Sequence, residues 1–169
     1  MPLDKSALID FLEEVDKQLE KPVTLVAVGG SALTLLDAKT STIDVDFTIP
    51  SDDYNVFKKT LNSIPHGFKV DCWKDGMVFS QTLPDDYLEK SITIKKMRHI
   101  QLRALHPVDI VVTKIGRLDA RDKQDIETCI KKFKLTKNQI SRRAKTVAYV
   151  GRDENYETNL NHVLNNFFK

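Results

Sequence analysis

The pattern of apolar and polar positions predicts a series of helices and strands along the first half of the chain. Leu8, Leu12 and Val15 recur at helical spacing among charged residues, so residues 4–20 are expected to form an amphipathic helix that covers one face of a sheet. Residues 23–28 are nearly all apolar or β-branched, which is typical of a strand buried on both faces. A glycine pair ends this strand, and residues 31–36 are apolar enough for a short buried helix.

The next segments have strand periodicity. Apolar and acidic residues alternate over 43–47, which predicts a strand whose acids share one face and whose apolar residues share the other. Pro50 ends that strand, and Ser51 is expected to supply the N-cap hydroxyl of a helix that runs to about residue 64. Residues 68–73 alternate again as a third strand, and a turn is expected at 74–76. Further strands are expected around 77–80 and 91–104.

From residue 107 onward the apolar spacing is helical. Thr136 and Gln139 match the capping-box spacing at the start of one helix, and Gly151 is expected to end a helix. The order of elements predicts an α/β (α+β) fold, in which a mixed sheet is packed with helices and followed by a C-terminal helical segment. Residues 1–134 are expected to form the main domain, and residues 135–169 a helical extension packed on that same domain.

Composition narrows the class of protein. At 169 residues the chain fits one domain, and 41% hydrophobic with 30% charged residues is typical of a folded soluble protein. Lys and Arg number 26 against 24 Asp and Glu, which excludes an overall excess of positive charge as a basis for nucleic-acid binding. No segment approaches the ~20 apolar residues of a membrane span, so no membrane association is expected and the predicted location is cytoplasmic.

Cysteine and histidine do not form a recognisable metal motif. Cys72 and Cys129 are far apart and are expected to be buried free thiols, the alternative being a disulfide that an intracellular chain would normally keep reduced. The histidines have no metal-ligand spacing and are expected on the surface or in loops: His66, His99, His106 and His162.

The sequence feature that indicates chemistry is Gly29-Gly30-Ser31 followed by Asp44 and Asp46. Two acids spaced by two on a strand point the same way with Cα atoms ~6.5–7 Å apart, so both carboxylates can reach one cation or a close pair. Magnesium prefers such oxygen ligands and is completed by substrate phosphate oxygens. Glycine amides and the Ser31 hydroxyl at a helix start suit a phosphate. The pattern is neither a P-loop nor a Rossmann turn.

These residues resemble the nucleotidyltransferases of the polymerase-β superfamily. The resemblance is closest to a small prokaryotic branch that includes the toxins of AbiE-type toxin–antitoxin systems, in which Gly-Gly-Ser/Thr-Ala-Leu precedes Thr-x-Asp-x-Asp-Phe. The matching residues here are 29–33 and 42–47. A third acid, a helical Lys and an Arg-Asp-x-x-Asp run follow in that branch, and Asp71, Lys114 and the run from Arg121 to Asp125 fall in that order.

The resemblance implies a function and a set of site residues. Asp44, Asp46 and Asp71 would hold Mg²⁺ or Mn²⁺ and act in catalysis, and Asp71 would accept the proton of the attacking hydroxyl. Residues expected to bind the nucleoside triphosphate (NTP) are Gly29, Gly30, Ser31, Thr42, Lys114 and Arg121. The enzyme would transfer a nucleoside monophosphate to an acceptor that is a protein hydroxyl, an RNA end or a small molecule. The branch also implies an antitoxin partner.

Several interpretations stay open on the sequence alone. The branch often has an Arg where this chain has Lys39-Thr40-Ser41, which favours the alternative of a non-catalytic module that binds a nucleotide or a partner. Asp75 and Glu89 are alternatives to Asp71, although only Asp71 lies mid-strand between apolar neighbours.

Other polar and aromatic residues have two readings each. Lys114 is either a phosphate contact or a side chain snorkelling from a buried helix face, and Trp73 either stacks on a base or packs internally. The basic run 142–145 either contacts an RNA backbone or is a solvated helix face. A structural ion-pair network is the alternative for the charged residues Arg117, Arg121, Asp122 and Asp125.

Overall fold

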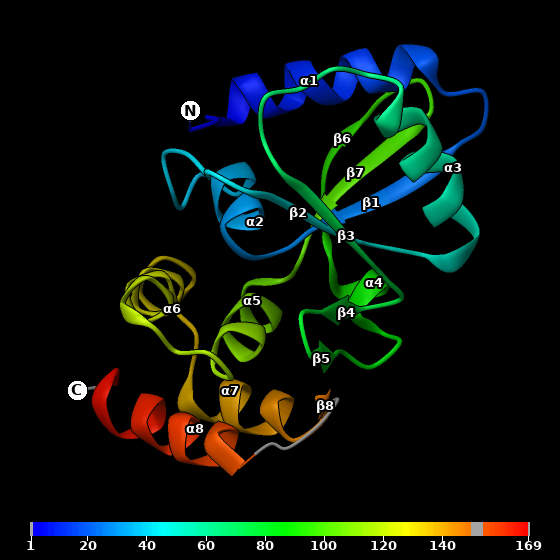
Figure 1. Ribbon diagram of the computed structural model, residues 1–169. Coiled ribbons are helices and arrows are strands. Elements are labelled where there is room, and N and C mark those ends of the chain that lie inside the picture. The colour runs from blue at the N-terminus through cyan, green and yellow to red at the C-terminus, as the bar shows by residue number, and fades with distance from the viewer. Residues whose placement is uncertain (1, 150–153, 169) are drawn as a thin grey trace.

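The computed structural model describes residues 2–149 and 154–168, and Figure 1 shows their arrangement. The strands are β1 (Val23–Ala27), β2 (Val45–Ile49), β3 (Val70–Lys74), β4 (Met77–Val78), β5 (Gln81–Thr82), β6 (Ile92–Lys96), β7 (Ile100–Ala104) and β8 (Ala148–Tyr149). The helices are α1 (Lys5–Gln18), α2 (Gly29–Leu35), α3 (Ser51–Asn62), α4 (Tyr87–Lys90), α5 (Pro107–Lys114), α6 (Ala120–Phe133), α7 (Lys137–Ala144) and α8 (Glu154–Asn166).

The main sheet is mixed and has five strands in the order β3-β2-β1-β7-β6. β1 pairs in parallel with β7, and β2 in parallel with β3, whereas β1 and β2 run antiparallel. The β2–β3 register places Asp46 opposite Asp71. Two acids that are 25 positions apart in sequence (71 − 46) therefore meet on neighbouring strands.

Helices cover the sheet and then form a separate layer beside it. α3 packs against β1 and β3 and contacts α1, whereas α2 packs against β1, β2 and β7. α2 also contacts α5. Helices α5 to α8 form a helical group, in which α5 contacts α6 and α7, and α7 contacts α8. In Figure 1 this helical group lies below the sheet, and α2 lies beside β2, above α6. The predicted α/β fold with a mixed sheet and a helical C-terminal segment is confirmed.

Local signals explain most of the boundaries. The Asp4 carboxylate caps α1 by accepting a hydrogen bond from the Ala7 N–H, and the predicted capping box of Thr136 and Gln139 is present at α7. The burial pattern of β1 confirms a strand with both faces covered. Gly151, the predicted helix stop, lies outside the described residues.

Two predicted features near the acidic strand are wrong. β2 begins at Val45 rather than at Ile43, so Ile43 does not join the buried face and is 54% exposed. Ser51 is the first helical residue of α3 and not its N-cap, a position that Pro50 takes. The Ser51 hydroxyl and backbone N–H instead donate to the Asp75 carboxylate.

The region after β3 is more finely divided than predicted. Two-residue strands β4 and β5 form a hairpin, and β8 adds to it as a third strand. The single strand expected over 91–104 is a pair, β6 and β7, joined antiparallel. Strands of two residues show no usable periodicity, which is why β5 and β8 were not anticipated.

Both cysteines are free thiols, as predicted. Cys129 is buried, but Cys72 on β3 is only partly buried, so the prediction of two buried thiols is wrong for Cys72. Burial raises the pKa of both thiols, Cys72 to about 11 and Cys129 to about 12. No helix among the described residues is long and apolar enough to cross a membrane.

The C-terminal segment is tied to α5 by a buried ion pair that the sequence did not reveal. Arg143 on α7 donates to both carboxylate oxygens of Asp109 on α5, at 2.6 and 3.0 Å, and to Asp86 at 2.9 Å. Arg143 is 8% exposed and Asp109 is fully buried, so the solvated-face interpretation of 142–145 is wrong for Arg143. We propose on this basis that residues 135–169 are an extension of the main domain.

Replacing Arg143 with Met should destabilise the protein by about 3–5 kcal/mol, because the buried Asp109 carboxylate would lose its bidentate partner. The adjacent Arg142 is exposed, and Arg142→Met should change stability by less than ~0.5 kcal/mol. Urea denaturation of the two variants checks this. Equal midpoints for both would show that the pair does not anchor α7.

Candidate functional site

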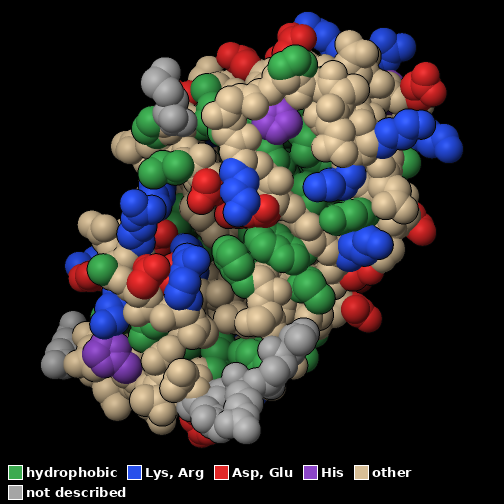
Figure 2. Space-filling view, viewed as in Figure 1, with side chains coloured by type: hydrophobic (Ala, Val, Ile, Leu, Met, Phe, Trp, Pro, Cys, Tyr) green, Lys and Arg blue, Asp and Glu red, His purple; other side chains and the backbone are tan. Residues whose placement is uncertain are grey.

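A cavity of about 730 Å³ is lined on one side by residues of α2 and β2 and on the other by residues of α5 and α6. Figure 2 shows acidic and basic side chains side by side on this face of the molecule, next to hydrophobic side chains near its centre. Predicted site residues that line the cavity are Gly29, Gly30, Thr42, Asp44, Asp46, Asp71, Lys114 and Arg121. The structure therefore brings together every predicted site residue except Ser31.

The backbone that carries Asp44 and Asp46 is fixed by α2. The Ser31 hydroxyl donates to the Asp44 carbonyl at 3.2 Å and accepts from the Asp46 N–H at 3.1 Å. Thr42 adds a second hydroxyl donor to the Asp44 carbonyl at 2.7 Å, and the Val28 N–H donates to the Asp46 carbonyl at 3.0 Å. These bonds hold the two acids in a set position relative to the glycine turn.

The hydroxyl of Ser31 thus has a different position from the one predicted. Ser31 is fully buried, and its hydroxyl bonds to the β2 backbone instead of facing the cavity. Because both hydrogen bonds of this hydroxyl go to the backbone of residues 44 and 46, it is not directed at the space where a phosphate would bind. Ser31 is a positioning residue that links the start of α2 to the acidic strand. Thr42 also bonds to this backbone, although it does line the cavity.

The glycine turn lies beside the carboxylates. Gly29 has φ +54°, a backbone conformation that side chains disfavour, and a Cβ there would lie 3.9 Å from Oδ2 of Asp46. A Cβ on Gly30 would lie 3.1 Å from the Thr42 hydroxyl oxygen, so the chain segments approach closely here. No side chain caps the start of α2, which leaves its first amides without a side-chain acceptor.

Asp71 lines the same cavity as Asp44 and Asp46. Asp71 lies opposite Asp46 in the β2–β3 register, and its carboxylate is 3.3 Å from the ammonium of Lys69. The two alternatives do not line the cavity: Asp75 bonds to Ser51 at the start of α3, and Glu89 is an exposed residue of α4.

The electrostatic signature of this arrangement appears at Asp46. Burial, and to a smaller extent the negative charges of Asp71 and Asp44, together raise the pKa of the Asp46 carboxyl to about 6. Lys114 and Lys69 partly offset this effect. Like charges therefore accumulate on this wall of the cavity, a situation that a bound cation would relieve.

The residues fit a divalent cation only with help from a substrate. Among the described residues, no group of three or more His, Cys, Asp or Glu side chains is arranged to hold a metal ion by itself. The predicted three-carboxylate metal site is therefore not preformed. Mg²⁺ is usually held by one or two carboxylates together with phosphate oxygens and water, and the repelling pair of Asp46 and Asp71 matches that requirement.

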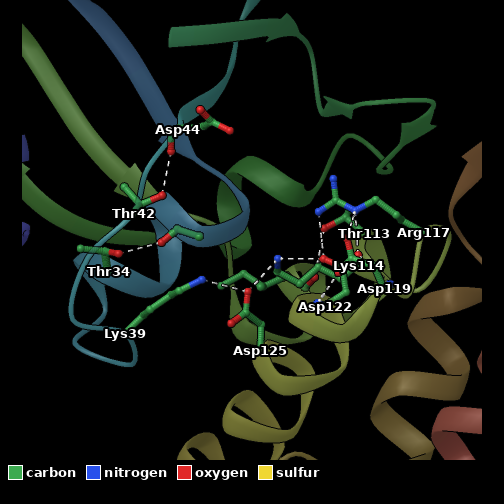
Figure 3. Close-up of polar contacts among 12 residues, drawn as sticks. Thr34, Lys39, Thr42, Asp44, Thr113, Lys114, Arg117, Asp119, Asp122 and Asp125 are labelled. Carbon is green, nitrogen blue, oxygen red and sulfur yellow. Dashed lines mark hydrogen bonds and ion pairs between the residues drawn. The ribbon is translucent and has the colours of Figure 1, made fainter. Parts of the chain in front are cut away.

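The opposite wall of the cavity carries positively charged side chains that form ion pairs with acidic residues of α6. The Lys114 ammonium lies 3.1 Å from the Asp125 carboxylate and 3.4 Å from that of Asp122, and only 8% of Lys114 is exposed. Lys39 approaches Asp125 at 3.4 Å from the other side, as Figure 3 shows. The snorkelling interpretation of Lys114 is wrong, since its ammonium ends in a buried ion-pair network.

Arg117 belongs to the same network. Its guanidinium donates to both carboxylate oxygens of Asp122, at 2.7 and 2.9 Å. Asp122 and Asp119 also form a capping box at the start of α6. Hydrogen bonding to Asp122 raises the pKa of Arg117, and Asp46 adds a smaller effect in the same direction. The alternative of a structural ion-pair network is therefore confirmed for Arg117, Asp122 and Asp125. Arg121 is exposed and lines the cavity.

Two apolar residues line the cavity that the sequence did not identify as site residues. Phe79 is 49% exposed and Ile43 is 54% exposed, and both line the cavity. Trp73 does not line it and instead packs against Phe79 with ring centroids 4.8 Å apart. None of the four histidines lines the cavity, and His106, in the loop between β7 and α5, is the half-buried N-cap of α5. A signal for Phe79 existed in its position after a turn, but a lone Phe there is not specific.

Comparison with known proteins gives a family and a fold. The model of a family described as "Nucleotidyltransferase of unknown function (DUF6036)" matches residues 6–168. No curated protein matches the sequence. A crystal structure of ANT(2″)-Ia in complex with adenylyl-2″-tobramycin is similar, with a TM-score of 0.56 and 10% identity over 83% of this chain and 94% of that one.

A solution structure of the antibiotic-resistance factor ANT(2″)-Ia is similar as well, with a TM-score of 0.54 and 10% identity over 83% of this chain and 89% of that one. At this identity the likeness shows the fold. It agrees with the mixed sheet and helical segment described above.

Replacing Ser31 with Ala should lower the stability of the nucleotide-free protein by about 1–3 kcal/mol, because the buried Asp46 N–H would lose its acceptor. Thr40, which is exposed, serves as the control in Thr40→Ala. Chemical denaturation measures the difference. A Ser31→Ala variant as stable as the wild type would contradict a positioning role.

Replacing Asp46 with Asn should stabilise the metal-free protein at pH 7–8 by roughly 1–3 kcal/mol. The folded-state pKa of about 6 lies above the reference value of 3.8, so the ionised carboxylate costs stability as pH rises through this window. The gain should vanish near pH 4. Thermal unfolding in a chelator, with the exposed Asp52→Asn as control, tests it. A variant less stable than the wild type at pH 8 would refute the charge accumulation.

Proposed function

Because the chain belongs to the nucleotidyltransferase family DUF6036, we propose that it transfers a nucleoside monophosphate from a metal-bound NTP to a hydroxyl acceptor. The observation that carries this proposal is the shared cavity of Asp44, Asp46 and Asp71 with the glycine turn at 29–30. In it, acids suited to a divalent cation lie next to backbone amides suited to phosphate.

The proposed binding mode assigns the phosphates to the space between the two walls. The amides of Gly29 and Gly30 approach the β and γ phosphates, and Lys114 and Arg121 supply positive charge from the opposite side. Asp44, Asp46 and Asp71 would hold the cation, and the Ser31 and Thr42 hydroxyls support the backbone that carries Asp44 and Asp46. A bound Mg²⁺ or Mn²⁺ would neutralise charge on the phosphate oxygens.

The proposed reaction is an in-line displacement at the α-phosphorus. The acceptor oxygen forms a bond to this phosphorus, the bond to the β-phosphate oxygen breaks, and pyrophosphate leaves. Asp71 accepts the proton of the acceptor hydroxyl, because it lies opposite Asp46 and lines the same cavity. The protein mainly positions the reactants and stabilises charge.

The acceptor is proposed at the level of its chemistry, a hydroxyl on a protein, an RNA end or a small molecule. A relation to AbiE-type toxins, with an antitoxin partner and a cytoplasmic location, rests on the motif resemblance at residues 29–33 and 42–47. A gene for a small DNA-binding protein next to this one would support that relation.

A binding module without transfer is the second candidate. Lys39 occupies the place where the related branch often has Arg, and its ammonium is 3.4 Å from the Asp125 carboxylate. A lysine cannot make the bidentate contact of an arginine, so one phosphate contact would be weaker. Binding without turnover is the outcome that distinguishes this candidate.

The double variant Asp44→Ala/Asp46→Ala should abolish transfer, because the cation would lose two of its three proposed protein ligands. The measurement uses α-labelled NTPs with Mg²⁺ or Mn²⁺ and total cellular RNA, protein and small molecules as acceptors. Asp52→Ala, which removes an exposed acid outside the cavity, should retain full activity.

Calorimetry with Mg-NTP completes the test. Wild type that binds nucleotide but labels no acceptor would support the binding module. Equal labelling by wild type and the double variant would refute the enzyme proposal.

A further inference from the structure

Two exposed apolar side chains lie at the cavity. Among the described residues, the large hydrophobic side chains that are exposed are Ile43 and Phe79, and both line this one cavity. Ile43 directly precedes Asp44, and Phe79 belongs to the β4–β5 hairpin. Exposed apolar surface of this kind, next to polar groups, marks a ligand contact more often than a random surface position.

Phe79 occupies a hairpin position at which a bulky side chain is unusual. Met77 pairs with Thr82 and Val78 with Gln81, so Phe79 and Ser80 form the two-residue loop of the hairpin. Phe79 has φ +56°, a conformation that hairpin loops usually give to Gly, Asn or Asp. A bulky residue held at positive φ is typical of a functional position.

The ring of Phe79 is held in place from two sides. Trp73 packs against it with centroids 4.8 Å apart at 52°, and the guanidinium carbon of Arg117 lies 5.2 Å from the ring centroid. Arg117 is itself fixed by two hydrogen bonds to the buried Asp122. With both neighbours present, 49% of Phe79 stays exposed, so the ring offers an orientated, open surface to the cavity.

We propose that Phe79, with Ile43, is the nucleobase-binding surface of the cavity: the planar base of an NTP stacks on the exposed part of the Phe79 ring, beside the Arg117 guanidinium. This rests on the proposed function. A planar aromatic ring beside a cation suits a nucleobase, because every base has a π-face that stacks on Phe and on guanidinium groups. The carboxylates and the glycine turn of the same cavity account for the triphosphate, and the apolar pair accounts for the base.

The test separates the base from the phosphates. Calorimetry compares Mg-ATP, Mg-GTP, Mg-CTP and Mg-UTP with Mg-tripolyphosphate, which has the same charged groups and no base. Wild type should bind its best NTP more tightly than tripolyphosphate. Phe79→Asn should weaken NTP binding about 10-fold or more and leave tripolyphosphate binding unchanged, whereas Phe79→Tyr should retain the NTP affinity.

Stability supplies a second readout that a purely structural ring would not give. Asn tolerates φ +56°, so Phe79→Asn should have a Tm equal to or above that of the wild type while losing NTP affinity. Lys134→Asn is the matched control, because Lys134 has φ 53° at the end of α6 and does not line the cavity. It should not lose stability, and its binding should be unchanged.

Each remaining outcome overturns the proposal. A lower Tm for Phe79→Asn would assign the ring to packing, and an unchanged NTP affinity would show that the base does not contact it. An equal loss for NTP and tripolyphosphate would show general damage to the cavity. Wild type that binds tripolyphosphate as tightly as any NTP has no base site, although the proposed function survives. Wild type that binds neither refutes the proposed function itself and the base surface with it.

Discussion

Repulsion between carboxylates on one wall of the cavity is the constraint on which the rest of the site depends. The β2–β3 register sets Asp46 opposite Asp71. Hydrogen bonds from the Val28 N–H and from the Ser31 and Thr42 hydroxyls fix the backbone of the segment that carries Asp44 and Asp46. The acids cannot separate without breaking sheet pairing. The pKa of Asp46 is raised first by burial and then by the charges of Asp71 and Asp44, and folding elsewhere in the protein must offset the cost of keeping this carboxylate ionised.

The opposite wall of the cavity carries positively charged side chains whose positions are fixed by ion pairs. Lys114 is held by Asp122 and Asp125, and Arg117 by Asp122, so each ammonium or guanidinium has a fixed position before any substrate arrives. Asp122 also takes part in the capping box of α6, so the start of that helix and the cavity wall are one structure. Charges that are oriented in advance stabilise an anionic group without reorganising when it binds.

The sequence was sufficient where a pattern depends on neighbouring residues. Period-two and helical spacing predicted the mixed sheet and the main helices. The association of Asp71 with Asp44 and Asp46 was implied by the family resemblance. Local caps such as the Thr136–Gln139 box were also recoverable. The position of Asp71 at the cavity followed from its mid-strand place between apolar neighbours.

Features that depend on long-range pairing were not recoverable. The buried partner of Arg143 is Asp109, 34 residues earlier, and a basic run gives no sign of that contact. Ser31 was expected to face phosphate because nothing in its neighbourhood shows that its hydroxyl bonds to the strand 13 and 15 residues later. Phe79 became informative only once its φ angle and its place at the cavity were known.

The distribution of charge also helps to distinguish a protein that transfers a nucleotide from one that only binds it. A site that held an anionic nucleotide without a cation would gain from Lys114 and Arg121 but lose from Asp44, Asp46 and Asp71, since like charges repel. Protein carboxylates beside a phosphate are favourable only when a cation lies between them. We infer from the acidic wall that nucleotide binding would depend on a metal ion, and that an arrangement with this cost is better explained by chemistry at the α-phosphorus than by binding alone.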